Sequence, residues 1–270
     1  MVKLTDEEFL EFVVYMQKNY GIDLSKKKVL IEGRLSNLIE KKGMSSFSEY
    51  LSNVKRNNKD EITTLVNKLT TNYTYFNREE KHFKFLRDVV LPCQKKNNKS
   101  KIIKIWSAGC SSGEEPYTLA MVIDDYFKFM SDQWKIQIHA TDISENVLSK
   151  AREGIYGDES LKEIPESYKK RYFEKTKDGK YRVVPEIKKN VSFKIFNLMD
   201  PVIAKNKYDV IFCRNVMIYF NAETKAKIVN KFYNATKPGG YLMIGHAETI
   251  QREQSKYLYV NPAIYKKEQV

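Results

Sequence analysis

The chain has 270 residues, of which 42% are hydrophobic and 13% aromatic, so it can bury a sizeable core in one large domain or two smaller ones. Lys and Arg number 47 against 34 Asp and Glu, and the net charge of +13 favours an anionic partner such as a nucleic acid, an acidic membrane or an acidic protein. The composition excludes an intrinsically disordered or collagen-like chain.

The first 70 residues contain only helical patterns. Thr5 and Glu8 have the spacing of a capping box, and apolar residues then recur at helical spacing up to a break at Gly21. Three more helices are predicted to follow, over residues 25–43, 46–54 and 62–69. We therefore predict an all-α N-terminal domain over residues 1–70, which a linker over 71–100 joins to the rest of the chain.

From residue 101 onward, strand-like segments alternate with helical ones. The Lys-Asp-Gly-Lys sequence at 177–180 lies between two β-rich runs and indicates a hairpin, which predicts a small antiparallel β insertion over 157–196. We therefore expect an α/β domain over 101–270 with a mostly parallel sheet covered by helices on both faces. The predicted strands are 101–109, 135–143, 208–220 and 238–248, and the helices between them are 114–129, 146–152 and 224–236.

Two motifs at predicted strand ends indicate a site for an adenosine group. Small residues, including Gly109 and Gly113, follow the first strand and precede a helix, so the backbone there can approach a ligand closely. Asp142 ends the second strand, where a carboxylate can accept hydrogen bonds from both hydroxyls of a ribose. Each motif has a structural alternative, a tight turn for the first and a helix N-cap for the second. Together they do not distinguish a nicotinamide from a sulfonium cofactor.

Two further motifs bring polar and aromatic side chains towards the same edge of the sheet. Residues 213–220, CRNVMIYF, follow an apolar strand and deliver Arg214, Asn215 and an aromatic tail to the ligand-binding edge. Residues 70–79, TTNYTYFNRE, lie between the helical part and the sheet and combine short polar with aromatic side chains. Such a segment suits the lining of a cleft between two domains, and a solvated linker is the alternative.

The chain resembles the chemotaxis receptor methyltransferases, the CheR family, over essentially its full length. The matching elements, in order, are TTNYTYFNRE, IWSAGCSSGEEPYTLAM, ATDIS, ARxGIY at 151–156, RYF at 171–173, FCRNVMIYF and KPGGYLMIGHAE. The resemblance implies a helical N-terminal domain followed by a Rossmann-like methyltransferase domain with a small β insertion, and it implies S-adenosylmethionine as the cofactor. It places the cofactor contacts on nine residues: Asn72, Thr74, Arg78, Glu115, Asp142, Asn197, Leu198, Asn215 and Val216.

The resemblance also implies the reaction, which is methylation of glutamate side chains of chemotaxis receptors for adaptation. Asp142 would then hold the ribose, Glu115 the amino group of the cofactor, and 197–198 would lie near the adenine. A glutamate carboxylate has an ordinary pKa of about 4.3 and is already a nucleophile at neutral pH, so no strong general base is needed. We assign catalytic roles to Arg78, which would hold the incoming carboxylate or the nearby cofactor, and to Tyr219, which would hydrogen-bond the carboxylate or cap the methyl site.

A basic stripe on the second helix suits receptor docking. Lys27, Arg34 and Lys41 recur every seven residues and so share one side of the helix. The methylation regions of such receptors are acidic coiled-coil helices, which a basic stripe would steer and align. An ordinary solvated helix face is the alternative. The hairpin turn at 175–180 is short for the family, which weighs against binding of a receptor C-terminal tether.

Two other functions remain open as alternatives. A nucleic-acid methyltransferase would suit the charge of +13, but the chain lacks the Asn/Asp-Pro-Pro-Tyr/Phe motif that holds a flipped base, so we predict no nucleic-acid partner. A non-catalytic receptor-binding module is the second, although Arg78, Asp142 and Asn215 are intact. An NAD-linked oxidoreductase is disfavoured because the chain lacks GxGxxG.

Cysteines and histidines show no ligand spacing. The three cysteines, at 93, 110 and 213, form no CxxC pair, and the three histidines are isolated, so we predict neither a disulfide nor a metal site. His246 lies near the predicted site, and its role stays open.

The N-terminus has no signal-peptide core and no apolar run approaches about 20 residues, so we expect a cytoplasmic monomer that does not insert into a membrane.

Overall fold

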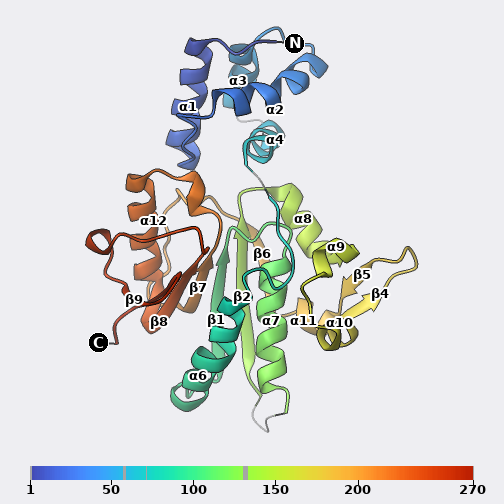
Figure 1. Cartoon of the computed structure of the whole chain (residues 1–270), viewed down its shortest axis with the longest axis vertical. Helices are drawn as coiled ribbons and strands as arrows, with labels where there is room; N and C mark the ends of the chain where they lie inside the picture. The colour runs from blue at the N-terminus through green and yellow to red at the C-terminus, as the bar shows by residue number, and fades with distance from the viewer. Residues whose placement is uncertain (1, 57–58, 71, 130–132, 270) are drawn as a thin grey trace.

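The computed structural model describes residues 2–56, 59–70, 72–129 and 133–269. Its N-terminal part is a cluster of helices at one end of the molecule (Figure 1). The first begins with the predicted capping box, in which the Thr5 hydroxyl accepts a hydrogen bond from the N–H of Glu8 at 3.2 Å, and it ends at Gly21 with φ +70°. The helices are α1 (Asp6–Tyr20), α2 (Lys28–Lys41), α3 (Phe47–Lys55) and α4 (Lys59–Leu69).

The second helix begins three residues later than Ser25, where the sequence pattern placed its start. The N–H of Ser25 donates to the Asp23 carboxylate at 3.0 Å, so Ser25 belongs to a turn before the helix. Leu35 and Ile39 on α2 are fully buried in the same core cluster as Phe12 of α1. The N-terminal helices therefore enclose an apolar core, as their sequence periodicity predicted.

The remainder of the chain forms an α/β domain around a central sheet. The first five strands in spatial order run parallel, and the last two run antiparallel to their neighbours. In spatial order the sheet consists of β6 (Val191–Ile195), β2 (Lys135–Asp142), β1 (Ile102–Ala108), β7 (Tyr208–Cys213), β8 (Thr236–Ile244), β10 (Ile264–Lys266) and β9 (Leu258–Asn261).

Alternate residues of the central strands pack into two different cores. On β1, Trp106 lies in the cluster that includes α12 (Ala222–Ala235) and the N-terminal helices, whereas Ile105 lies in the cluster that includes α7 (Glu114–Phe127). The period of two in a strand sends neighbouring side chains to opposite faces, so both faces are covered. The predicted fold class, an α/β domain preceded by an all-α domain, is confirmed.

The β insertion is smaller than predicted. Its antiparallel sheet has three strands, β3 (Ile155–Tyr156), β5 (Tyr181–Val183) and β4 (Phe173–Lys175), and it projects from one side of the molecule with helices α9 (Asp158–Leu161), α10 (Glu166–Tyr172) and α11 (Pro185–Lys188) (Figure 1). Residues 191–195, which the sequence analysis placed inside the insertion, instead form β6 and pair in parallel with β2. Parallel pairing joins segments far apart in the chain, so no local signal marks it.

The predicted linker over 71–100 contains a helix that the sequence analysis missed. Helix α5 (Lys81–Phe85), a π-helical turn η1 (Leu86–Val90) and α6 (Leu91–Asn97) follow one another without a break. Phe83, Leu86 and Val90 bury one side of this helix against the sheet domain. Among the residues that the structure describes, no helix combines the length and apolar character needed to cross a membrane.

Candidate active site

A cavity of about 410 Å³ opens at the carboxyl ends of the parallel strands. Its walls come from the segments that follow β1, β2, β6 and β7, together with residues of the N-terminal helices and of segment 70–78. Ligands bind at this edge of open parallel sheets, and the volume lies in the range of small-molecule sites. All nine residues that the sequence assigned to cofactor contacts line it: Asn72, Thr74, Arg78, Glu115, Asp142, Asn197, Leu198, Asn215 and Val216.

The turn after β1 has no room for a side chain at Gly109. This residue has φ +84°, and a Cβ atom built on it would lie 2.4 Å from Cγ2 of Val216. The N–H of Gly109 donates to the Thr141 carbonyl at the end of β2, at 2.8 Å. Glycine is therefore required here by both conformation and space, and it lets the loop after β7 pack onto the turn.

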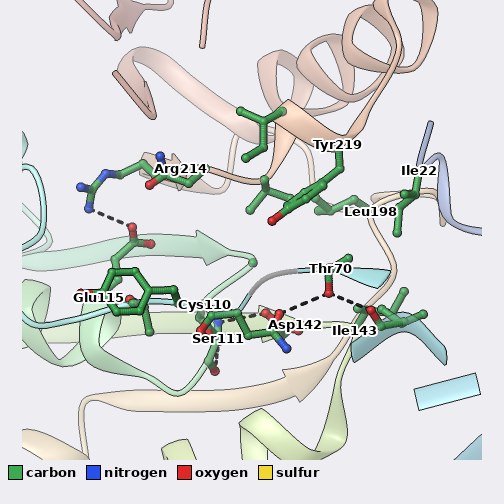
Figure 2. A pocket seen from close by; sticks show the side chains of 18 of the residues that line it. Ile22, Thr70, Cys110, Ser111, Glu115, Asp142, Ile143, Leu198, Arg214 and Tyr219 are labelled. Atoms are coloured by element: carbon green, nitrogen blue, oxygen red, sulfur yellow. Dashed lines mark hydrogen bonds and ion pairs between the residues drawn. The ribbon is translucent and has the colours of Figure 1, made fainter. Parts of the chain in front are cut away.

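Asp142 faces the cavity at the end of β2 (Figure 2). Its carboxylate accepts hydrogen bonds from the N–H groups of Ser111 at 2.9 Å and Ser144 at 3.0 Å. Burial raises the pKa of Asp142, and these backbone hydrogen bonds oppose that effect. The carboxylate is thus fixed in position, and each of its oxygens keeps a lone pair for a ligand hydroxyl.

Arg214, on the wall of the cavity, links two acidic residues. Its buried guanidinium forms ion pairs at 3.1 Å with both Glu79 and Glu115, and it also donates to the carbonyl of Arg78. Figure 2 shows the pair with Glu115, whose other oxygen accepts from the Ser107 hydroxyl at 2.7 Å. Burial raises the pKa of Glu115 even with this pair. At Glu79 burial also acts to raise the pKa, but the charge of Arg214 and hydrogen bonds from Arg214, Asn215 and the N–H of His246 together outweigh it, so the pKa is lowered.

Glu248 holds the loop after β7, a role that the sequence analysis did not assign. Its buried carboxylate accepts hydrogen bonds from the N–H groups of Asn215 and Ile218, both at 3.1 Å, and of Gly245 at 2.6 Å. Asn215 has φ +59°, a conformation that costs free energy outside glycine and persists only when surrounding contacts impose it. The acid is visible in the sequence as part of the HAE motif, but Asn215 lies 33 positions away, so no local pattern joins the two.

Arg78 lies on the cavity wall, and the contacts that its guanidinium makes with described residues are with a carbonyl group and an aromatic ring. It donates to the carbonyl of Tyr73 at 2.8 Å and lies 6.0 Å from the centre of the Tyr75 ring. Within the described ranges, no carboxylate lies within ion-pair distance of it. An arginine fork with donors to spare beside a cavity is suited to binding an anion. Thr71, in the same motif, lies outside the described residues.

The N-terminal helices complete the wall at Tyr219. The N–H of Asp23 donates to the Tyr219 carbonyl at 2.7 Å, and Ile22 forms a β-bridge with Phe220. Figure 2 shows the Tyr219 hydroxyl pointing into the space opposite Asp142. The position of Tyr219 therefore depends on the contact between the two domains.

The three basic residues proposed for docking lie outside the cavity. Lys27, which directly precedes α2, and Lys41, the last residue of α2, are exposed. Arg34 is half-buried and donates to the carbonyls of Lys68 at 3.0 Å and Thr70 at 3.1 Å, which are at the end of α4. Arg34 therefore fixes the end of α4 beside the cavity, a contact that the seven-residue spacing did not reveal.

Comparison with known proteins identifies the chain. The family model described as "CheR methyltransferase, all-alpha domain" matches residues 7–70, and "CheR methyltransferase, SAM binding domain" matches residues 72–265. The chain belongs to the CheR methyltransferase family. A chemotaxis protein methyltransferase from Borreliella burgdorferi is 44% identical over 98% of this chain and 96% of its own length. Chemotaxis protein methyltransferase 1 from Pseudomonas aeruginosa is 37% identical over 94% of each chain.

The range matched by the SAM-binding family model can be compared with the residues that line the cavity. Membership confirms the resemblance noted from the motifs and shows an S-adenosylmethionine-dependent methyltransferase that acts in chemotaxis. The SAM-binding family model spans every segment that lines the cavity between residues 72 and 220. The cavity and the SAM-binding family model therefore involve the same part of the chain.

Proposed function

We propose that this CheR protein transfers the methyl group of S-adenosylmethionine to glutamate carboxylates of chemotaxis receptors, giving glutamate methyl esters and S-adenosylhomocysteine. The observation that carries the proposal is the Arg78 guanidinium, which faces the cavity and has no acidic partner among the described residues. Its planar fork matches a carboxylate. An unpaired guanidinium at the cavity wall supports an acidic acceptor beside the methyl donor.

The cavity residues fit the parts of the cofactor by their chemistry. Asp142 would accept from the ribose hydroxyls, and Asn197 with Leu198 would border the adenine. Glu115 already accepts from Ser107 and Arg214, yet each carboxylate oxygen has a second lone pair, so it can also accept from an ammonium group. Of the remaining five, Arg78 would hold the incoming carboxylate or the cofactor near it. The other four, Asn72, Thr74, Asn215 and Val216, would shape the wall around the reacting end.

The protein would contribute positioning and not a base. The bound sulfonium supplies an electrophilic methyl group, and the glutamate oxygen attacks it without proton transfer because it is ionised at neutral pH. The acidic groups nearest the reaction are already engaged, Glu79 and Glu115 with Arg214 and Asp142 with backbone N–H groups. Orienting the carboxylate through Arg78 in a space that Tyr219 shields from water can lower the barrier by several kcal/mol.

The test is the fate of a labelled methyl group. Purified protein is incubated with methyl-labelled S-adenosylmethionine and receptor-containing membranes, and the products are treated with base. Volatile labelled methanol is expected, because base hydrolyses a carboxyl methyl ester. Label in RNA or DNA would support the nucleic-acid alternative, and cofactor binding without any transfer would support the non-catalytic module.

Arg78 and Tyr219 are expected to contribute to transfer. Arg78→Ala should lower kcat/KM for methyl transfer by about 100-fold, as loss of one well-placed charged donor does in other active sites. Tyr219→Phe removes only a hydroxyl and should cost about tenfold, roughly one hydrogen bond. Initial rates with receptor membranes measure both, and calorimetry measures cofactor affinity separately. Rates close to wild type with intact cofactor affinity would exclude these side chains from catalysis.

Lys27 and Lys41 are expected to guide an acidic coiled-coil helix of the receptor. Their combined reversal, Lys27→Glu with Lys41→Glu, should raise the apparent KM for receptor about tenfold, the lower end of steering effects, and should flatten its dependence on salt. Arg34 is left intact because it binds the end of α4. The matched control is Lys95→Glu with Lys96→Glu, on α6 at the opposite end of the molecule (Figure 1). If the two double variants changed the apparent KM for receptor equally, a docking role for Lys27 and Lys41 would be excluded.

The remaining parts of the proposal concern the setting of the reaction. We propose a cytoplasmic monomer whose partners are acidic receptor helices and neither nucleic acid nor the membrane interior. The short hairpin between β4 and β5, where the Thr176 N–H donates to the Lys180 carbonyl at 2.8 Å, supports the view that no receptor tether binds there. Methyl transfer needs no metal in this scheme.

A further inference from the structure

Three side chains with metal-binding atoms converge behind the cofactor cavity. Glu79 and His82 come from the segment that enters α5, and His246 comes from the loop after β8. One ligand atom of each lies within 4.8 Å of the others. None of the three lines the cofactor cavity. They therefore form a separate cluster, which the fold assembles from two segments far apart in the sequence.

The buried member of this cluster lacks hydrogen-bond partners. The His82 side chain is fully buried, and neither of its ring nitrogens has a hydrogen-bond partner among the described residues. Leaving buried polar atoms unpaired costs about 1–3 kcal/mol per group, so such a group usually has a partner. The ring centre lies 4.8 Å from that of His246, and Nδ1 lies 3.5 Å from Oε2 of Glu79. A bound ion between these groups would supply a partner for one of the two ring nitrogens.

The ionisation state suits a metal ligand. Burial, helped by the charge of Arg214, lowers the pKa of His82 to about 3, so its imidazole is neutral at physiological pH. A neutral imidazole has a lone pair for a metal, and no proton has to leave before an ion binds. His246 is exposed, which gives an ion a route in from solvent.

We propose that Glu79, His82 and His246 form a binding site for a divalent transition-metal ion, with Zn²⁺ as the representative ion, and that occupation of this site weakens cofactor binding. Two imidazoles and one carboxylate are a ligand set of zinc and of related ions, whereas Mg²⁺ and Ca²⁺ prefer oxygen ligands. The ion is an inhibitor in this proposal and takes no part in methyl transfer.

Arg214 couples the two sites. The same oxygen of Glu79 that faces His82 also pairs with Arg214 at 3.1 Å, so a cation on Glu79 competes with the guanidinium. Arg214 in turn holds Glu115 of the cavity wall and the carbonyl of Arg78. Repulsion between ion and guanidinium would therefore disturb two groups of the cofactor cavity. Because coupling between binding sites is reciprocal, bound cofactor should lower the affinity for zinc by the same factor.

The first test measures zinc binding directly and does not depend on methyltransferase activity. The chelator-treated full chain is titrated with ZnCl₂ in competition with a fluorescent zinc indicator. One ion per chain is expected for the wild type, and His246→Asn should weaken binding by more than about tenfold, since losing a ligand exceeds the 10–100-fold typical of losing its supporting hydrogen bond. His246 is exposed, so its replacement leaves the core intact. Wild-type zinc affinity in this variant would overturn the proposal.

The second test separates this site from other zinc-binding groups. The control variant is His139→Asn, which removes a half-buried histidine that contacts Tyr208 outside the cluster and should bind zinc like the wild type. Calorimetry with S-adenosylhomocysteine is then run with and without one equivalent of zinc. Zinc should lower the affinity in the wild type and in His139→Asn but not in His246→Asn. A zinc effect that persists in His246→Asn, or no effect in the wild type, would overturn the coupling.

Discussion

Arg214→Ala is expected to lower the free energy of unfolding by about 3–5 kcal/mol, because removing one partner of a buried ion pair leaves uncompensated buried charge. The side chain is 3% exposed, and those of Glu79 and Glu115 are 14% and 13% exposed, so both carboxylates are largely shielded from solvent and depend on the guanidinium for charge balance. The carbonyl of Arg78 loses its donor as well. Cofactor affinity should fall with stability, since Glu115 lines the cavity.

Urea unfolding at neutral pH measures this loss, and Arg152→Ala provides the matched control. Arg152 pairs with Glu145 at 2.5 Å on the surface, with side chains 43% and 46% exposed, so its loss should cost less than about 1 kcal/mol. Similar losses in both variants would show that burial adds nothing to the Arg214 network.

The pH dependence gives a second check on the Arg214 network. In the wild type, the pairing holds the pKa of Glu79 below its ordinary value, so its contribution is present at neutral pH and is lost as pH falls through the folded-state pKa. In Arg214→Ala the acidic groups can protonate more readily. The difference in unfolding free energy between the two proteins should therefore begin to narrow above about 4.3, the ordinary pKa of glutamate, where buried Glu79 and Glu115 take up protons in the variant. It should go on narrowing until Glu79 of the wild type is protonated below that pH. A gap that stays constant with pH would contradict the assignment.

The sequence predicted the parts of the site that follow strands locally. Gly109 and Asp142 were placed correctly because small residues and an acid at the end of an apolar strand are signals within one short segment. Arg214 was seen at the edge of the sheet, but its partners were not, since Glu79 and Glu115 are 135 and 99 positions away. The same limit hid the Glu248 contacts to the loop after β7. Ionic and hydrogen-bonding networks form between segments, and one sequence carries no record of those pairings.

One error in the fold has the same origin. Strand β6 was assigned to the β insertion because it follows the hairpin in sequence, while its partner β2 is decided by the packing of the whole sheet. The helix from Lys81 to Asn97 was missed although Phe83, Leu86 and Val90 recur at helical spacing, because the sequence analysis treated the whole of 71–100 as a linker. The docking role assigned to Arg34 from its spacing stays a prediction, and the structure adds that its guanidinium donates to carbonyls at the end of α4. Periodicity indicates which face of a helix is polar but not what that face contacts.

Gly109→Ala is expected to weaken binding of S-adenosylhomocysteine by about 10–100-fold, because the turn after β1 would have to move. The new methyl group would lie 2.4 Å from Cγ2 of Val216, and φ +84° disfavours any L side chain by about 1–2 kcal/mol. Relief requires Val216 to shift, and Val216 is itself part of the cavity wall. Each 1.4 kcal/mol of lost binding free energy lowers the affinity tenfold, and calorimetry measures the affinity directly.

Two companion variants separate the clash from the backbone conformation. In Gly109→Ala with Val216→Ala the clashing methyl group is gone, so affinity should recover relative to Gly109→Ala but stay below that of Val216→Ala alone, because the strain at φ +84° remains. Gly33→Ala is the control for glycine replacement as such. Gly33 lies within α2, and a Cβ atom added there would meet no described atom within 4 Å, so alanine should stabilise the fold by about 0.5–1 kcal/mol and leave cofactor affinity unchanged. Full affinity in Gly109→Ala would mean that the turn after β1 does not shape the cofactor cavity.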